Sequence, residues 1–312
     1  MNRIFALRLI VSVIAFGTLT GCMAQQQLAQ EAQARAAMLG DKGVTVYAAG
    51  DVADCKKRPP KESAAAKTAA LIEAGLEREK DAAVLMLGDA TYPIGMPEEF
   101  ENCYQPTWGR FKQRTYPTPG NHEYYTPEAI GYYGYFDNIA GPGRRGYYSV
   151  DIGTWHVISL NSNLKPTQNQ AQLEWLKEDL DRNKAHCTLA FWHHAMFSSG
   201  GHGSDSRMEQ AWKLLAAAGA DVVLSGHDHD YERFVPKDAD GKRDDAHGMR
   251  EFVVGTGGAK LTPLTLQRSG SAVSDNSTYG VLKLTLKQQG YEWEFLPVDA
   301  GGFKDHGAAL CH

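Results

Sequence analysis

Three side chains that can bind metal ions, His227, Asp228 and His229, follow closely after the apolar run Val222–Leu224. Imidazole nitrogens and carboxylate oxygens are common ligands of zinc, iron and manganese. A short apolar run that leads into Gly226 predicts a buried strand, so these side chains are expected where the strand ends. One such run has little specificity, and its meaning depends on whether the rest of the chain supplies further ligands.

Four further turns place polar side chains at or just beyond segments that favour strands. They are Gly50-Asp51, Gly88-Asp89 with Tyr92, Gly120-Asn121-His122-Glu123, and His193-His194. In open α/β sheets, ligands bind outside the carboxyl ends of the strands. Each turn alone is explained equally well as a solvated loop, but five of them in order predict one shared site. Oxygen and imidazole ligands suit iron, manganese and zinc, and no thiolate is required.

Segments that favour strands alternate with segments that favour helices along the chain. The expected strands are 44–50, 82–88, 154–161, 187–192 and 220–226, and the expected helices are 62–80, 169–183 and 205–219. Nearly continuous apolar strands indicate a sheet that is covered on both faces. The segments 251–259 and 279–298 predict a further strand and a hairpin, which add antiparallel strands. The sequence therefore predicts a layered α/β domain with two mixed sheets packed together.

The combination of these turns resembles the calcineurin-like metallophosphoesterase superfamily. The segments GDATY (88–92) and GHDHDYER (226–233) make the chain most similar to purple acid phosphatases. The resemblance covers residues 44–300. It implies a four-layer α/β/β/α sandwich with two mixed sheets and a dinuclear metal centre at one end.

The resemblance also implies which residues bind the two metal ions. The first ion would take Asp51, Tyr92 and His229, the second would take Asn121, His193 and His227, and Asp89 would bridge them. A tyrosine phenolate favours Fe(III) in the first position, and the second ion is expected to be iron, zinc or manganese. A mononuclear site or a zinc-only site remains an open alternative.

Two histidines match substrate-facing positions of the family. His122 would bind phosphate, and His202, nine residues after His193, would bind phosphate or donate a proton to the leaving group. A plain loop histidine is the alternative reading of His202. His194 and Asp228 are expected to lie behind the ligands and to orient their neighbours.

Other polar and aromatic residues are expected to be structural. Arg233 is interpreted as an ion-pair or packing residue, and His156 as a hydrogen-bonded histidine within the sheet. The aromatic segment 124–136 could form a wall of the substrate site or a packed surface loop, and the sequence leaves both open.

These assignments predict a metal-dependent phosphatase that hydrolyses phosphate monoesters with a metal-activated hydroxide. The alternative on the same fold is a phosphodiesterase acting on nucleotides or phospholipid head groups. A non-catalytic metal-binding protein of the cell envelope is less favoured, because structural metal sites are normally closed, whereas His122 and His202 provide a substrate-facing side. The formal net charge of −5 supplies no basic surface, so stable nucleic-acid binding is not expected. The oligomeric state is left open.

Residues 1–22 have the pattern of a bacterial lipoprotein signal peptide. Arg3 and Arg8 form a positively charged region before the apolar segment 9–16. The sequence LTGC, which ends at Cys22, resembles a lipobox whose cysteine carries the lipid. An ordinary signal peptide with an unrelated cysteine is the alternative.

The organisation of the remaining chain follows from its composition. Residues 23–42 are rich in Ala and Gln and are expected to be a polar tether, and residues 43–312 are expected to be the catalytic domain. Export and lipid attachment predict a protein of the bacterial cell envelope that is bound to the membrane by its N-terminal anchor.

Four cysteines remain after Cys22, and an oxidising compartment would allow them to form disulfides. They are Cys55, Cys103, Cys187 and Cys311, for which three pairings are possible. We favour Cys55–Cys103 and Cys187–Cys311, because the first two cysteines follow closely on two turns of the shared site.

Overall fold

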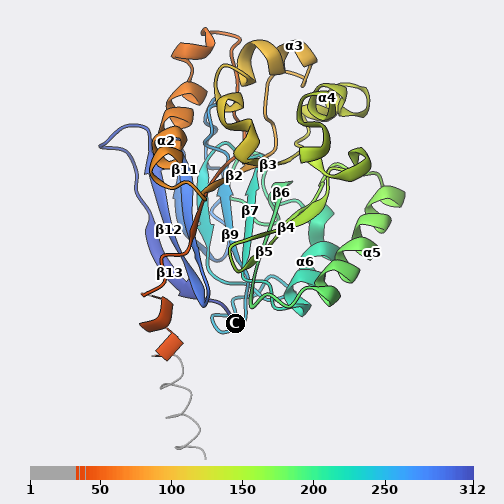
Figure 1. Ribbon diagram of the computed structural model, residues 1–312, viewed down its shortest axis with the longest axis vertical. Coiled ribbons are helices and arrows are strands. Elements are labelled where there is room, and N and C mark those ends of the chain that lie inside the picture. The colour runs from red at the N-terminus through yellow and green to blue at the C-terminus, as the bar shows by residue number, and fades with distance from the viewer. Residues whose placement is uncertain (1–32, 35, 39) are drawn as a thin grey trace, which may run out of the picture.

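The computed structural model describes residues 33–34, 36–38 and 40–312. The predicted signal peptide and the predicted lipid attachment at Cys22 lie outside these residues. Within the described part of the chain, no helix has both the length and the apolar character needed to cross a membrane. Figure 1 shows two sheets in the centre of the domain, with helices on the outer side of each.

The first sheet has six strands in the order β13-β12-β11-β1-β2-β3. They are β1 (Val44–Ala49), β2 (Ala83–Leu87), β3 (Thr115–Thr118), β11 (Gly280–Lys287), β12 (Gly290–Pro297) and β13 (His306–Leu310). β1, β2 and β3 run parallel, and β11, β12 and β13 pair antiparallel. β2 is apolar and buried at every position, as a strand covered on both faces must be.

The second sheet has seven strands in the order β10-β8-β9-β7-β6-β5-β4. They are β4 (Tyr148–Ile152), β5 (Trp155–Ser159), β6 (Cys187–His194), β7 (Val222–Gly226), β8 (Tyr231–Phe234), β9 (Arg250–Val254) and β10 (Ser271–Asp275). β5, β6, β7 and β9 run parallel. A hydrogen bond from Gly50 N to Val254 O (2.9 Å) joins the end of β1 to the end of β9, so the parallel strands of both sheets end on the same side.

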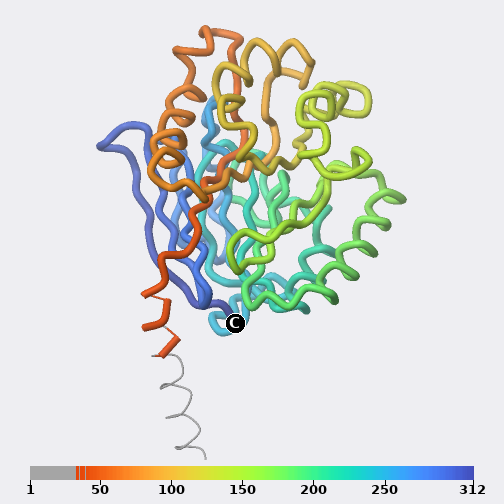
Figure 2. The backbone as a smooth tube through the Cα atoms, viewed as in Figure 1, coloured from red at the N-terminus to blue at the C-terminus, as the bar shows by residue number. Residues whose placement is uncertain are grey.

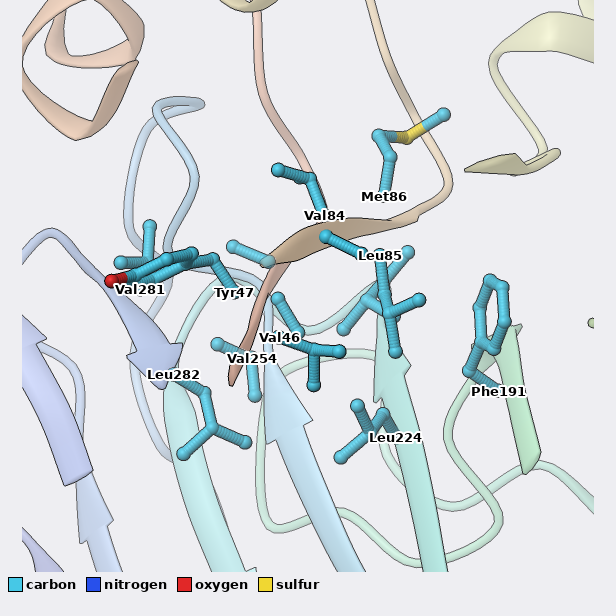
Figure 3. Close-up of a cluster of buried hydrophobic side chains, with 14 of the residues drawn as sticks. Val46, Tyr47, Val84, Leu85, Met86, Phe191, Leu224, Val254, Val281 and Leu282 are labelled. Atoms are coloured by element: carbon cyan, nitrogen blue, oxygen red, sulfur yellow. The ribbon is translucent and has the colours of Figure 1, made fainter. Parts of the chain in front are cut away.

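The two sheets pack face to face around an apolar core. Val46 and Leu85 of the first sheet and Phe191 and Leu224 of the second are fully buried in one cluster, shown in Figure 3. Tyr47 points to the opposite face of the first sheet, because successive side chains of a strand alternate between its faces.

Helices cover the outer faces. α2 (Ala64–Arg78) lies against the first sheet, and α5 (Pro166–Arg182) and α6 (Glu209–Ala217) lie against the second, where Trp192 and Trp212 share a second core. The short helices α3 (Pro97–Glu99) and α4 (Ile130–Phe136) lie at the upper end in Figure 1. This is the predicted four-layer α/β/β/α arrangement with two mixed sheets.

Five strands were not predicted from the sequence, namely β3, β4, β8, β10 and β13. Each has only four or five residues. β3 carries a proline, and β10 and β13 are partly exposed, so the apolar pattern that identified the central strands is missing.

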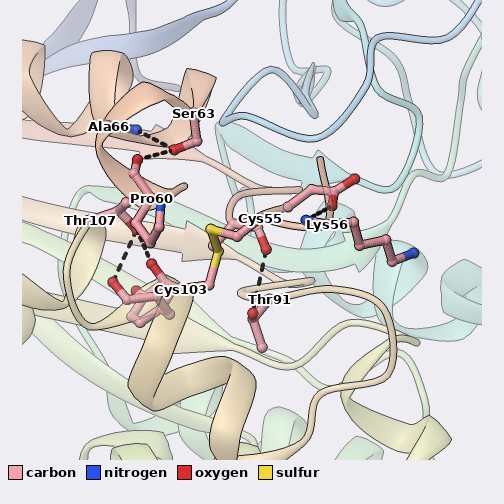
Figure 4. The surroundings of a disulfide bond; sticks show 11 residues. Cys55, Lys56, Pro60, Ser63, Ala66, Thr91, Cys103 and Thr107 are labelled. Atoms are coloured by element: carbon pink, nitrogen blue, oxygen red, sulfur yellow. Dashed lines mark hydrogen bonds between the residues drawn. A yellow bond between two sulfur atoms is a disulfide. The ribbon is translucent and has the colours of Figure 1, made fainter. Parts of the chain in front are cut away.

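The structure contains the two favoured disulfides, Cys55–Cys103 and Cys187–Cys311. In Figure 4 the first one joins the loop after β1 to the helical segment Phe100–Tyr104, beside the N-terminal end of α2. The loop after β1 is thus held covalently close to the end of the sheet.

Two further predictions concern polar residues in the sheets. The guanidinium of Arg233 forms a buried ion pair with Asp305 (Nε–Oδ2 2.7 Å). The imidazole of His156 lies between the carboxylates of Asp151 (3.1 Å) and Asp179 (2.8 Å). Both residues therefore have the structural roles expected of them.

The two described ends of the chain lie together at the lower end of the domain in Figure 2. Met38 is buried, and Asp41 Oδ2 accepts a hydrogen bond from Gln288 N (2.7 Å), so the last residues of the expected tether contact the domain. Cys311 N donates to Gln289 O (3.0 Å) at the same turn. β1 starts at this end and leads to Asp51 at the other.

Candidate metal centre

The seven predicted ligands come together from both sheets. Asp51, Asp89 and Asn121 follow β1, β2 and β3, and Tyr92 lies three residues beyond Asp89. His193 is the second-last residue of β6, and His227 and His229 follow β7. The side chains therefore meet outside the carboxyl ends of parallel strands, as expected for this type of sheet.

Three of these side chains form a first group of donor atoms. Tyr92 Oη lies 3.0 Å from Asp51 Oδ1 and 3.2 Å from His229 Nε2. Asp51 Oδ1 and His229 Nε2 are 3.3 Å apart. The three atoms thus form a nearly equilateral triangle.

Three others form a second group. His193 Nε2 lies 3.1 Å from Asn121 Oδ1 and 3.2 Å from His227 Nδ1. Asp89 Oδ2 is shared by both groups, because it lies 3.2 Å from Tyr92 Oη and 3.4 Å from His193 Nε2.

The donor separations suit metal ions. A ligand distance of about 2.1 Å gives neighbouring ligands about 3.0 Å apart in an octahedron and about 3.4 Å apart in a tetrahedron. The carboxylates of Asp51 and Asp89 are 0% and 1% exposed, and among the described residues they form ion pairs only with histidines. Since buried carboxylates need a compensating positive charge, the residues present fit two cations that share Asp89.

The backbone is strained where it presents these ligands. Asp51, Asp89 and His227 have φ angles of 59°, 51° and 71°, in the left-handed region that non-glycine residues rarely adopt. Glycine is required next to them: a Cβ on Gly120 would lie 2.1 Å from Asp89 Oδ1, and one on Gly88 would lie 2.5 Å from His193 Nδ1. The turns are therefore tight because the ligands approach the backbone closely.

Backbone groups fix the orientation of the imidazoles. His193 Nδ1 bonds to Leu87 O (2.8 Å), and His229 Nδ1 bonds to Lys260 O (2.8 Å). Because each carbonyl accepts a hydrogen bond from Nδ1–H, the Nε2 lone pair of each ring is directed into the centre.

Charge and burial oppose each other in the centre. Burial lowers the pKa of His193, but the facing carboxylate of Asp89 outweighs it and raises the pKa to about 9. Asp51 does the same for His229, whose pKa also rises to about 9. Burial and the neighbouring His193 lower the pKa of His227 to about 3. Protons and metal ions thus compete for the nitrogens of His193 and His229.

The two predicted substrate-facing histidines lie at the rim. His122 Nε2 is 3.8 Å from Asp89 Oδ2, and its Nδ1 bonds to Pro93 O. His202 is exposed, and its ring centroid lies 4.3 Å from that of His227. Both imidazoles therefore flank the donor atoms on a side that solvent reaches.

Asp228 and His194 lie behind the ligands. Asp228 Oδ1 accepts from His202 N (2.7 Å) and its Oδ2 from Gly203 N (3.0 Å), so this buried carboxylate holds the loop that carries His202. His194 Nδ1 bonds to Ser162 Oγ (2.7 Å), and burial together with His193 lowers the pKa of His194.

Glu123 is a site residue whose role the sequence did not predict. Its buried carboxylate accepts hydrogen bonds from the backbone N–H groups of Asp89 (2.9 Å), Ala90 (2.9 Å) and Gly120 (2.6 Å). Burial and the charge of Asp89 raise the pKa of Glu123 to about 8. Glu123 thus joins the turn after β2 to the turn after β3. Its position after the predicted ligand Asn121 was the only signal in the sequence.

Sequence comparisons find relatives of this chain among the purple acid phosphatases. Purple acid phosphatase 21 of Arabidopsis thaliana is 30% identical over 206 residues, which cover 58% of this chain and 45% of that protein. Purple acid phosphatase 15 of the same plant is 33% identical over 165 residues, covering 46% and 31%. The chain thus matches less than half the length of these relatives.

A solved structure shares the fold. The purple acid phosphatase PPD1 from seeds of yellow lupin (Lupinus luteus) superposes with a TM-score of 0.69 at 19% identity, covering 86% of this chain and 54% of that one. The profile of the calcineurin-like phosphoesterase family matches residues 44–231, which is more than half of the chain. On this match and fold, the chain belongs to the calcineurin-like phosphoesterase family.

Proposed function

We propose that this chain is a metal-dependent phosphatase that hydrolyses phosphate monoesters. The observation that carries the proposal is the position of Asp89 Oδ2, which belongs to both groups of donor atoms and so favours two neighbouring cations. When bound, such a pair polarises phosphoryl oxygens and lowers the pKa of a water molecule.

The residues divide between the two ions as their donor groups do. Asp51, Tyr92 and His229 would hold the first, Asn121, His193 and His227 the second, and Asp89 both. A phenolate in the first group supports Fe(III) there, and the mixed oxygen and nitrogen set of the second supports iron, zinc or manganese.

The remaining steps fall to the rim histidines. His122 Nδ1–H donates to Pro93 O, and Nε2 faces the centre, so the ring with a proton on both nitrogens can donate a hydrogen bond from Nε2 to a phosphoryl oxygen. His202 is exposed and can donate a proton to the leaving oxygen. Asp228 holds the backbone of His202 for this task.

The test is turnover of p-nitrophenyl phosphate and bis(p-nitrophenyl) phosphate by protein loaded with iron, zinc or manganese. We expect monoester turnover, which Asn121→Ala and His227→Ala abolish without unfolding the protein. His306→Ala, an exposed histidine of β13, serves as the control and should behave as wild type. Activity of either ligand variant near that of wild type would contradict the proposal, and faster diester turnover would favour the phosphodiesterase alternative.

The proposed location is the bacterial cell envelope, with Cys22 as the site of lipid attachment. The support is the sequence pattern of residues 1–22. Radiolabelled palmitate incorporated by wild type and absent from Cys22→Ser would test it, and equal labelling of both would contradict it.

A further inference from the structure

A cavity of about 720 Å³ adjoins the loops that carry the candidate metal centre. Its lining includes three cationic and three aromatic side chains, which are Arg144, Arg145, Lys165, Tyr124, Tyr133 and Tyr147. It lies between the region of α4 and the N-terminal end of α5, which Figure 1 shows on the same side of the domain. None of these six side chains was assigned a role above.

One wall of the cavity is continuous with the ligand Asn121. The N–H group of Tyr124 donates to the carbonyl of Asn121 (3.1 Å), and both residues belong to the turn after β3. The cavity therefore begins one hydrogen bond away from a residue of the second donor group.

The opposite wall is held to the first by Asn161. Its side-chain amide donates to Tyr124 Oη (2.7 Å) and to the carbonyl of Arg145 (3.1 Å). The next residue, Ser162, bonds to His194 beside the metal ligands. Both walls are thus connected to loops of the centre, one through Asn121 and the other through Ser162 and His194.

The cavity has a net positive charge, because its lining holds three cationic side chains and one acidic side chain. Among the described residues, no ion pair engages Arg144, Arg145 or Lys165, and Glu128 is the single acidic residue of the lining. The Arg145 guanidinium lies 5.3 Å above the ring of Tyr147, which holds its position. The N-terminal end of α5 adds a partial positive charge.

Strained backbone is concentrated at the centre and at this cavity. The described residues include seven non-glycine residues with positive φ: Asp51, Asp89 and His227 at the centre, Glu128, Ala129 and Arg144 at the cavity, and Asp137. Strain of this kind persists where the surrounding structure over-determines the conformation, which is typical of functional sites. A Cβ on Gly146 would lie 2.6 Å from Tyr133 Oη, so the arginine loop is also packed closely against α4.

We infer that this cavity binds a second phosphate group on the leaving-group side of the substrate, so that the enzyme prefers phosphate esters of sugars that carry two phosphates. The inference rests on the proposed phosphatase function. The two arginines would form the charge-assisted bonds to the second phosphate, and the tyrosines would contact the sugar.

A second, smaller cavity provides a matched control. It measures about 260 Å³ and lies beside the turn after β1, and its lining has four cationic residues (Lys57, Arg58, Lys67 and Lys260) and two acidic ones (Asp54 and Glu62). Lys57→Gln/Arg58→Gln therefore removes the same charge as Arg144→Gln/Arg145→Gln, but from a different cavity of similar net charge.

The experiment compares kcat/KM for fructose bisphosphate and for the two fructose monophosphates derived from it. Wild type and the Lys57/Arg58 control should prefer the bisphosphate about tenfold or more, since each charge-assisted bond can contribute about that factor. Arg144→Gln/Arg145→Gln should lose this preference while its activity on p-nitrophenyl phosphate stays within about twofold of wild type, because these side chains do not contact the reacting phosphate.

Every result separates the cavity from the phosphatase function. Suppose that p-nitrophenyl phosphate is hydrolysed but wild type shows no preference for the bisphosphate. The inference is then wrong and the proposed function stands. The same conclusion follows if the Arg144/Arg145 variant keeps this preference or if the Lys57/Arg58 control loses it. If no ester is hydrolysed, the proposed function fails. Calorimetric titration with fructose bisphosphate then tests whether the cavity binds this compound, independently of turnover. Weaker binding by the Arg144/Arg145 variant than by the control would support it, and equal binding would overturn it.

Discussion

The carboxylate of Asp228 is predicted to affect turnover only through the position of His202. Its two oxygens accept hydrogen bonds from His202 N (2.7 Å), Gly203 N (3.0 Å) and the hydroxyl of Ser198. Asp228→Asn replaces one acceptor oxygen by an NH₂ group, which must then face at least one of these donors. A hydrogen bond to a charged group contributes about 1.5–3 kcal/mol, so the ordering equilibrium of the loop should weaken about 10- to 100-fold.

The effect on catalysis has an upper limit. A positioned general acid contributes about 100-fold or more, so His202→Ala should slow esters with poor leaving groups by about that factor. Asp228→Asn leaves part of the loop population ordered and should lower kcat for these esters about tenfold. In the His202→Ala background the same change should add less than about twofold, because two residues that act through one group are not additive.

The assay is kcat for an alkyl phosphate and for p-nitrophenyl phosphate, together with the metal content of each variant. Asp275→Asn is a matched control, because Asp275 also accepts from two backbone N–H groups (Ser277 and Thr278) and from one serine hydroxyl, in the turn after β10. It should leave kcat unchanged. The reasoning fails if the effects of Asp228→Asn and His202→Ala multiply, or if Asp228→Asn loses metal.

Three further changes test the centre and the fold. Glu123→Ala leaves three buried N–H groups without an acceptor and should lower the free energy of unfolding in urea by at least about 3 kcal/mol. Glu99→Ala also removes an acceptor of backbone N–H groups, but these hydrogen bonds are exposed, so it should cost under about 1 kcal/mol. Equal costs would contradict the role of Glu123. Iron-loaded protein should absorb visible light, and Tyr92→Phe should remove this band while iron stays bound; an unchanged spectrum would exclude the phenolate as a ligand. Burial lowers the pKa of His156, but the hydrogen bond to Asp179 outweighs burial, so the pKa in the folded protein is raised. The interaction of protonated His156 with Asp179 therefore stabilises the fold fully below the unfolded pKa of about 6.5. This stabilisation is lost as the pH rises through the higher folded pKa. The stability difference between wild type and His156→Asn should therefore shrink on going from about pH 6 to about pH 9, and a difference that is constant with pH would refute this.

Much of the centre could be predicted because most of the ligands lie near a strand end that the local sequence reveals; Asn121, which follows the unpredicted strand β3, was recognised from its motif instead. Asp89 follows an uninterrupted apolar strand, and His227 follows another. The apolar run and the residue at which it ends are therefore enough to place both ligands. The fold class followed from the same alternation of strands and helices.

The parts that could not be predicted depend on contacts between segments far apart in the sequence. Glu123 acts on Asp89 only because β2 and β3 lie side by side, and its own neighbourhood in the sequence does not indicate this. The aromatic segment 124–136 contains buried side chains, as a packed loop should, and its residues Tyr124 and Tyr133 also line a cavity. Arg144 lines the same cavity as residues of α4 and of the loop before α5, which no local pattern brings together.

The direction of β1 bears on what an anchored form of this protein could reach. Met38 and Asp41, which contact the domain, precede a strand of six residues that spans about 20 Å, and Asp51 lies beyond the far end of this strand. With a lipid at the proposed N-terminus, the reactive pole would point away from the bilayer. Dissolved esters could then approach the reactive pole from the side of the domain that faces away from its attachment point.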